Sequence, residues 1–145
     1  MSLMFKGRTR LALLAMLPLA GLTGLAACGG GGGGGASIAK GNAAHGKELY
    51  IQCAGCHQGV GTLVGPQHCG VMGRKAASIE GFAYSDAMAA SGLTWDDATM
   101  DAFLTSPISY VTGTNMGFAG FTEASDRADL IAYLHEMNND KTICP

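Results

Sequence analysis

Five consecutive residues, Cys53-Ala54-Gly55-Cys56-His57, constrain what this chain can be more than any other feature. Two thiols separated by two residues and followed at once by an imidazole form the attachment pattern of a c-type haem, in which the histidine also binds the iron. A thioredoxin-type redox pair or half of a zinc site would use the same thiol spacing. Neither needs the histidine, and neither a second Cys-x-x-Cys nor a paired histidine follows. We therefore predict one covalent haem c on Cys53 and Cys56, with His57 as an iron ligand.

The first 27 residues have the composition of an export signal. Three basic residues lie near the start, and the 17 residues from Leu11 to Ala27 are uncharged and mostly apolar, which is short for a membrane span. The segment ends in Leu25-Ala26-Ala27-Cys28, which resembles the lipobox of bacterial lipoproteins. We expect residues 1–27 to be removed as a lipoprotein-type signal peptide and Cys28 to carry lipid. An ordinary signal peptide with a chance cysteine, or an uncleaved anchor, are the alternatives.

Seven consecutive glycines, Gly29 to Gly35, follow this cysteine. Such a run cannot pack or hold a regular structure. It forms the main part of a flexible linker, residues 28–37, which spans roughly 15–18 Å by random-coil scaling. We therefore predict one domain, residues 38–145, that is exported, anchored to a membrane by lipid, and faces the periplasm or the cell exterior.

Two cysteines, Cys69 and Cys144, remain once Cys28 is assigned to lipid and Cys53 and Cys56 to haem. An exported protein lies in an oxidising space, where a leftover pair more often forms a disulfide than stays free. We predict a bridge between these two residues that holds the C-terminus against the body of the domain.

Helical signals divide the domain into four segments joined by glycine-rich loops. The expected helices cover residues 42–53, 86–91, 94–106 and 123–138. Asn42 is expected to cap the first, Thr94 to open the third and Thr122 to cap the last. The loops at residues 58–81 and 106–121 cannot fill a core unaided, but loops of this length can wrap a prosthetic group. The predicted fold class is all-α, with about four short helices and long loops around one covalently bound haem.

The second iron ligand must come from elsewhere in the chain. An electron carrier needs both axial positions filled, and a methionine sulfur raises the potential relative to harder ligands. Met116 is the candidate, because glycines flank it in Gly113-Thr114-Asn115-Met116-Gly117-Phe118-Ala119-Gly120 and it is distant in sequence from His57. Met88 and Met100 occur at helical core spacing, where plain packing is the simpler interpretation.

From about Gly41 to Asn138, the chain resembles the class I monohaem cytochromes c, of the mitochondrial type and its bacterial relatives. The resemblance covers nearly the whole domain and several separate motifs. It implies the cytochrome c fold, one haem c and single-electron transfer without enzymatic catalysis. His57 matches the proximal ligand and Met116 the distal one.

The resemblance also assigns residues around the haem. Pro66 matches the residue whose carbonyl accepts the ring N–H of the proximal histidine. The matches to a propionate arginine, two propionate hydrogen-bond donors, the threonine beside the distal methionine and the aromatic over the haem edge are Arg74, Tyr84, Trp95, Thr114 and Phe118. For Tyr84 and Trp95, plain core packing is the alternative. Gly46 and Tyr50 resemble the pair on which the C-terminal helix crosses at close range.

Four positions depart from the family pattern. Thr112 replaces the usual proline before Met116, which removes a rigid φ angle and predicts a more labile loop. Phe103 replaces a tyrosine and Met88 an asparagine, so we expect a drier pocket beside the distal ligand. His68 stands where a leucine commonly packs. We interpret it as a local rearrangement around the disulfide, with ligation of the iron as the alternative.

The mature domain is acidic. Removing the three basic residues of the leader leaves six Lys or Arg against eleven Asp or Glu, a formal charge of −5. Residues 49–73 and 105–121, which are expected to frame the haem edge, contain no charged side chain, so the lysine ring of mitochondrial-type relatives is missing. No basic patch suits nucleic acid. The expected partners are redox protein complexes, met through brief, mostly apolar contacts that respond weakly to salt.

These features predict a membrane-tethered single-electron carrier and not an enzyme. We expect a monomer that cycles between Fe(III) and Fe(II), with a quinol-oxidising complex of a respiratory or photosynthetic chain as donor and a terminal oxidase or reaction centre as acceptor. One alternative is a haem peroxidase or gas-binding sensor in which Met116 dissociates. The other is a fixed cytochrome subunit of an oxidase complex.

Overall fold

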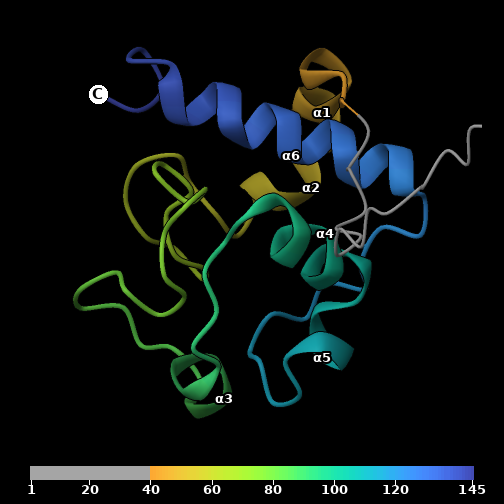
Figure 1. Ribbon diagram of the computed structural model, residues 1–145. Helices are drawn as coiled ribbons and strands as arrows, with labels where there is room; N and C mark the ends of the chain where they lie inside the picture. Colours follow the sequence, from red (N-terminus) through yellow and green to blue (C-terminus); the bar gives the residue numbers. More distant parts are fainter. Residues whose placement is uncertain (1–39) are drawn as a thin grey trace, which may run out of the picture. The chain divides into compact units, whose positions relative to one another are not determined.

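The computed structural model describes residues 40–145, and within this range the chain is built from short helices and long loops (Figure 1). The helices are α1 (Ala43–Leu49), α2 (Ile51–Ala54), α3 (Asp86–Ala90), α4 (Asp97–Thr105), α5 (Pro107–Tyr110) and α6 (Ala124–Asn139). The described residues contain no β-strand, so the all-α fold class is confirmed. The predicted leader, Cys28 and the glycine linker lie outside the described residues.

The helix predicted over residues 42–53 is interrupted at Tyr50. Asn42 is the N-cap, as predicted, and its side-chain oxygen accepts hydrogen bonds from two backbone N–H groups of the first turn. The Tyr50 carbonyl then accepts from the N–H of Cys53 at 2.8 Å and from that of Ala54 at 3.0 Å. The bond to Cys53 spans three residues rather than four and tightens the turn. The prediction of one continuous helix was therefore wrong, and α1 and α2 follow one another across this turn.

Asp96 caps α4, and the prediction that Thr94 opens this helix was wrong. The Asp96 carboxylate accepts a hydrogen bond from the backbone N–H of Thr99 at 2.7 Å. Thr94 lies two residues earlier, where it forms an isolated bridge with Lys75. Pairing with the loop around Lys75 keeps Thr94 extended, so the helix begins after Asp96.

The start of α6 is held by Arg127 instead of by the predicted cap, Thr122. Glu123 occupies the N-cap position without a side-chain hydrogen bond. Arg127 is buried, and its Nη1 donates to the carbonyls of Phe121 and Thr122, both at 2.9 Å. Its Nε donates to the Asp101 carboxylate at 2.7 Å. Because Asp101 belongs to α4, one side chain ties α4 to the segment that enters α6.

A short helix, α5, lies inside the loop predicted for residues 106–121, so that prediction was wrong at its start. Pro107 follows the end of α4, as expected, and is also the first residue of α5. A proline lacks the N–H that the first turn of a helix leaves unpaired, and its fixed φ suits that turn. Pro107 therefore follows the C-cap of α4, Ser106, and begins α5.

Helices α1 and α6 cross in direct contact (Figure 1). Gly46 permits the close approach, because a Cβ atom there would collide with the backbone oxygen of Asp129 and would lie 2.9 Å from the Tyr133 Cβ. The Tyr50 ring meets the Tyr133 ring edge-on, with 5.2 Å between centroids. The predicted crossing at Gly46 and Tyr50 is confirmed. The apolar stripe of α6 is buried and comprises Leu130, Ile131, Leu134 and Met137.

The structure pairs Cys69 with Cys144, with their sulfur atoms in contact and 5.4 Å between their Cα atoms. Cys144 is buried, so the C-terminal residues lie against the loop that follows α2. The bridge between these two cysteines in the mature protein stays a prediction.

Candidate functional site

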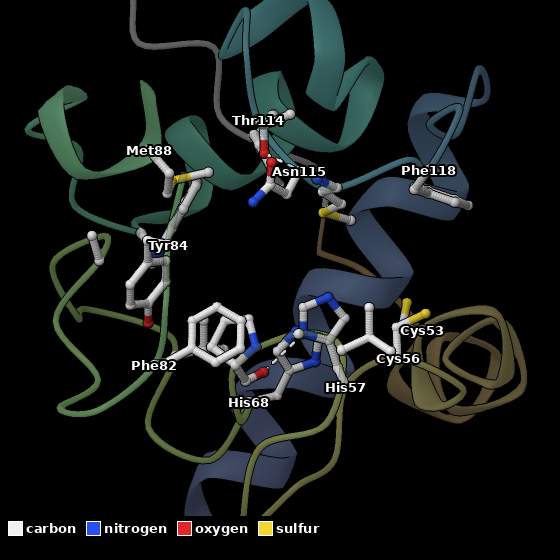
Figure 2. A pocket seen from close by; sticks show the side chains of 18 of the residues that line it. Cys53, Cys56, His57, His68, Phe82, Tyr84, Met88, Thr114, Asn115 and Phe118 are labelled. Carbon is white, nitrogen blue, oxygen red and sulfur yellow. Dashed lines mark hydrogen bonds between the residues drawn. The ribbon is translucent and has the colours of Figure 1, made fainter. Parts of the chain in front are cut away.

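A cavity of about 480 Å³ lies among the helices and long loops, within the range of small-molecule sites. Figure 2 shows His57 and His68 on one side of this space and Thr114 and Asn115 on the opposite side. Every haem-site residue predicted from the sequence lines it: Cys53, Cys56, His57, Pro66, Arg74, Tyr84, Trp95, Thr114, Met116 and Phe118. The fold therefore brings together residues that are up to 65 positions apart in the chain.

The two thiols reach the cavity from the end of α2. The N–H groups of Cys56 and His57 both donate to the Cys53 carbonyl, at 3.0 and 2.8 Å. This turn places both thiols and the imidazole on the lining of the cavity. Cys53 is half-buried and Cys56 is exposed. Before haem is attached, burial, and then the neighbouring Cys56 thiol, raise the pKa of the Cys53 thiol to about 11, so this thiol is protonated at neutral pH.

The imidazole of His57 is held in one tautomer. Its Nδ1 lies 2.8 Å from the Pro66 carbonyl oxygen, and a carbonyl can only accept, so Nδ1 carries the proton. Nε2 is then left with a lone pair for a metal, which is the arrangement of most metal-binding histidines. Burial lowers the pKa of His57 although the Pro66 hydrogen bond opposes this change, so the ring is neutral. These contacts suit a ligand of an iron atom in the cavity.

Gly65, which the sequence analysis did not single out, gives the His57 ring its space. A Cβ atom at this position would lie 2.6 Å from Nδ1 and 2.8 Å from Nε2 of the imidazole, closer than real Cβ contacts. The Gly65 N–H also donates to the Cys56 carbonyl at 2.8 Å, so its backbone cannot easily move away. Any larger residue must displace the imidazole.

We expect Gly65→Ala to lower the yield of haem-loaded protein and to destabilise what forms by about 1–3 kcal/mol, the usual cost of overpacking. The measurements are the ratio of haem to protein absorbance and the melting temperature. Gly55→Ala is the matched control, because Gly55 lies within the attachment motif, has a helical backbone and has nothing within 4 Å of its added Cβ. Equal behaviour of the two variants would contradict the role given to Gly65.

His68 lies against His57 and not on the opposite side of the cavity. The two rings are stacked, with 4.1 Å between centroids and 18° between planes. Burial, followed by the nearby His57 and Arg74, lowers the pKa of His68 to about 3, so the ring is neutral at physiological pH. The sequence interpretation of His68 as a rearrangement around Cys69 missed this contact. No local signal could have revealed it, because the stacking depends on how the loop folds back.

Met116 lines the cavity from the loop that precedes α6. The Thr114 N–H donates to the Val111 carbonyl at 2.9 Å, and the Met116 N–H donates to the Thr114 hydroxyl at 3.2 Å. Gly113, which lies between Val111 and Thr114, has a φ of +96°, a backbone conformation that favours glycine. Thr114 therefore shapes the turn that carries the sulfur. Met88 also lines the cavity but is buried in the core cluster, in agreement with a packing role.

The side chains expected near the propionates make protein contacts of their own. Arg74 donates to the carbonyls of Cys69 and Gln67, both at 2.8 Å, which holds the guanidinium beside the cavity. The Tyr84 hydroxyl accepts from the Ile79 N–H at 3.3 Å. Burial lowers the pKa of Arg74. Their contacts with a propionate remain predictions.

Aromatic side chains form much of the apolar wall of the cavity. Trp95 is buried and its ring lies 4.9 Å from that of Phe103, which is 5% exposed. Phe118 is half-buried and its ring lies 5.1 Å from Phe121. With Met88 these side chains give the wall few polar atoms, which supports the expectation of a dry distal pocket.

The donor set fits a covalently attached haem. Two thiols and an imidazole with a free Nε2 line one part of the cavity, a thioether lines another, and the remaining walls are mostly apolar. Within residues 40–145, no group of three or more His, Cys, Asp or Glu side chains could hold a bare metal ion. The cavity thus offers the groups that the sequence motif requires.

Comparisons with known proteins give one answer. The family model described as Cytochrome c matches residues 43–138. A cytochrome c2 from Rhodomicrobium vannielii is 47% identical over 102 residues, which cover 68% of this chain and 82% of that protein. A cytochrome c2 from Rhodoblastus acidophilus is 44% identical over 103 residues, which cover 69% of this chain and 96% of that protein. The solved structure of cytochrome cH from Methylobacterium extorquens matches with a TM-score of 0.65 and 41% identity, covering 66% of this chain and 99% of that one.

Proposed function

This chain belongs to the cytochrome c family, and from that premise we propose that it is a lipid-tethered electron carrier of a respiratory or photosynthetic chain. It carries one covalently bound haem c, and it is an electron-transfer protein and not an enzyme. The observation that supports the specific ligand set is the cavity, whose lining includes Cys53, Cys56, His57 and Met116. We assign thioether attachment to the two cysteines and axial ligation to His57 and Met116.

The role of the protein is to keep His57 and Met116 in place while the haem gains or loses one electron. The bound haem supplies a one-electron couple between Fe(III) and Fe(II). The Pro66 carbonyl holds the proton on Nδ1 of His57 and so keeps Nε2 available. The Thr114 hydroxyl holds the backbone of Met116. Mostly apolar walls exclude water, which lowers the reorganisation that each electron transfer requires.

A redox titration of the purified holoprotein, followed by its optical spectrum, tests this assignment. We expect a single one-electron transition and, in the oxidised protein, the weak long-wavelength band of a methionine–iron bond. Rapid CO binding by the reduced protein together with absence of that band would overturn the ligand set.

We propose that the docking face for redox partners is the uncharged rim of the cavity. Val64 is 80% exposed and lines the cavity, and Cys56, Asn115 and Gly117 are exposed there as well. Among the cavity-lining residues in the described part of the chain, only Arg74 and Lys75 carry charges. A face with so little charge gives weak electrostatic steering, so contact with a partner depends mainly on apolar surface.

The rate of electron transfer to the natural partner is therefore expected to change little with ionic strength. Stopped-flow measurement over a range of salt concentrations checks this, and Val64→Lys provides the comparison, because it places one charge on the proposed face. This variant is expected to show a steeper salt dependence than the parent. A steep decline for the parent itself would contradict the uncharged docking face.

We propose that lipid on Cys28 anchors the domain, that residues 28–37 act as its tether, and that the domain spans residues 38–145 on the periplasmic or outer side of a membrane. The supporting signals are the lipobox-like segment and the glycine run. No helix within residues 40–145 has the length and hydropathy needed to cross a membrane. Cys28→Ser is expected to move the holoprotein from the membrane fraction to the soluble fraction with an unchanged haem spectrum. Retention in the membrane would contradict lipid anchoring.

We also propose that Cys69 and Cys144 are bridged in the mature protein and that the protein is a monomer. Thiol counting by mass spectrometry tests the bridge, and two free thiols in the mature protein would exclude it.

Membership of an electron-transfer family argues against the peroxidase and sensor alternatives. A fixed place in an oxidase complex is tested by co-purification.

A further inference from the structure

The stacking of His68 on His57 has no part in the function proposed above. The ring centroids are 4.1 Å apart and the planes differ by 18°, so the two imidazoles lie face to face (Figure 2). The family pattern that the sequence resembles has a leucine at the position of His68. A leucine would fill the space but has no flat face. A stacked ring instead resists rotation of the neighbouring imidazole. Rotation would leave a gap at one edge of that ring and cause a clash at the other.

His68 is itself held in place by contacts on its other sides. Its Nδ1 lies 3.1 Å from the Tyr50 hydroxyl oxygen, and the two rings meet edge-on with 5.6 Å between centroids. Its backbone N–H donates to the Gln58 carbonyl at 2.8 Å. Tyr50 in turn packs against Tyr133 of α6. Contacts thus run from α6 through Tyr50 and His68 to the imidazole of His57.

We propose that His68 is a positioning residue that fixes the plane of the His57 imidazole, and that Tyr50 fixes His68. The Pro66 hydrogen bond sets the tautomer of His57 and restrains one ring atom, Nδ1, whereas the stacked His68 ring contacts the face of the imidazole. The stacked ring supplies the second restraint. The orientation of the imidazole plane determines which iron d orbital overlaps with the π-electrons of the ring. This inference rests on the proposed function only in taking His57 as an iron ligand.

Proton NMR of the ferric holoprotein with cyanide bound provides the test. Cyanide occupies the distal position and is cylindrically symmetric, so the spread of the haem-methyl shifts reports the plane of His57 alone. His68→Leu removes the stacked face, His68→Phe keeps a flat ring but loses the hydrogen bond, and Tyr50→Phe removes only the hydroxyl. His135→Leu is the matched control, because it removes a histidine that pairs with Asp97.

We expect His68→Leu to change the spread of the haem-methyl shifts from that of the parent. His68→Phe and Tyr50→Phe are expected to change it less, and His135→Leu not at all. The inference is overturned if His68→Leu keeps the parent shifts, even when its melting temperature falls, since that outcome leaves His68 a packing residue. Failure of Met116 ligation would not affect this experiment, because cyanide replaces the distal ligand in every variant.

Discussion

Met116→Ala is expected to abolish the methionine–iron band and to lower the midpoint potential by a sizeable fraction of the roughly 0.8 V that axial ligands span. The thioether stabilises the reduced state relative to harder ligands, so its loss favours the oxidised state. Met116 lies on the loop that lines the cavity, and alanine cannot reach across to replace the sulfur. The reduced variant is therefore expected to bind CO rapidly. Optical redox titration and flash photolysis of CO measure both effects.

Met88→Leu is the control for this experiment. Met88 also lines the cavity, but it is buried on α3 within the core cluster. Leucine keeps its volume, so both the spectrum and the potential should remain close to those of the parent. If Met116→Ala keeps the parent's potential, or if Met88→Leu loses the band, the assignment of the distal ligand is wrong.

Arg127→Met is expected to lower the free energy of unfolding by about 3 kcal/mol, near the low end of the cost of breaking a buried ion pair. The Arg127 side chain is 11% exposed and that of its partner Asp101 is 30% exposed, so the pair is only partly screened by water. Methionine keeps much of the apolar stem. It leaves the Asp101 carboxylate without its cation and removes the Arg127 hydrogen bonds to two backbone carbonyls.

Urea unfolding of the holoprotein, followed by circular dichroism, measures this loss. In a thermal melt, the melting temperature should fall by roughly 4–8 °C for each kcal/mol lost. Lys47→Met on α1 is the matched control, because Lys47 is exposed and should tolerate the same change within about 0.5 kcal/mol. Equal stability of the two variants would show that Arg127 does not hold α4 to the start of α6.

The chemistry of the site could be predicted from the sequence because it is encoded locally. The attachment motif places its thiols and imidazole within five consecutive residues, and no distant contact is needed to recognise it. Met116 was identifiable from its flanking glycines and its family motif. The cavity now gathers these residues with Arg74 and Trp95, although their contacts with a haem remain predictions.

Helix boundaries were predicted less well, since they depend on competition between neighbouring turns. Asn42 was recognised as a cap because its side chain bonds within its own helix. Thr94 failed as a cap because it pairs with Lys75, 19 residues away in the chain, whereas at Thr122 a nearer side chain, that of Arg127, binds the backbone carbonyl. A sequence pattern contains no information about a distant partner such as Lys75 until the chain has folded.

The sequence by itself determined the identity of the reactive groups and the class of fold, because both follow from residue types at fixed short spacings. Only the tertiary structure decided how those groups are held: Gly65 leaves room for the His57 ring, His68 stacks on it, and Arg127 joins two helices. These contacts join residues that are distant in the chain or lie on a loop without regular structure. Their geometry arises only when the loops close around the cavity and α6 packs on α1.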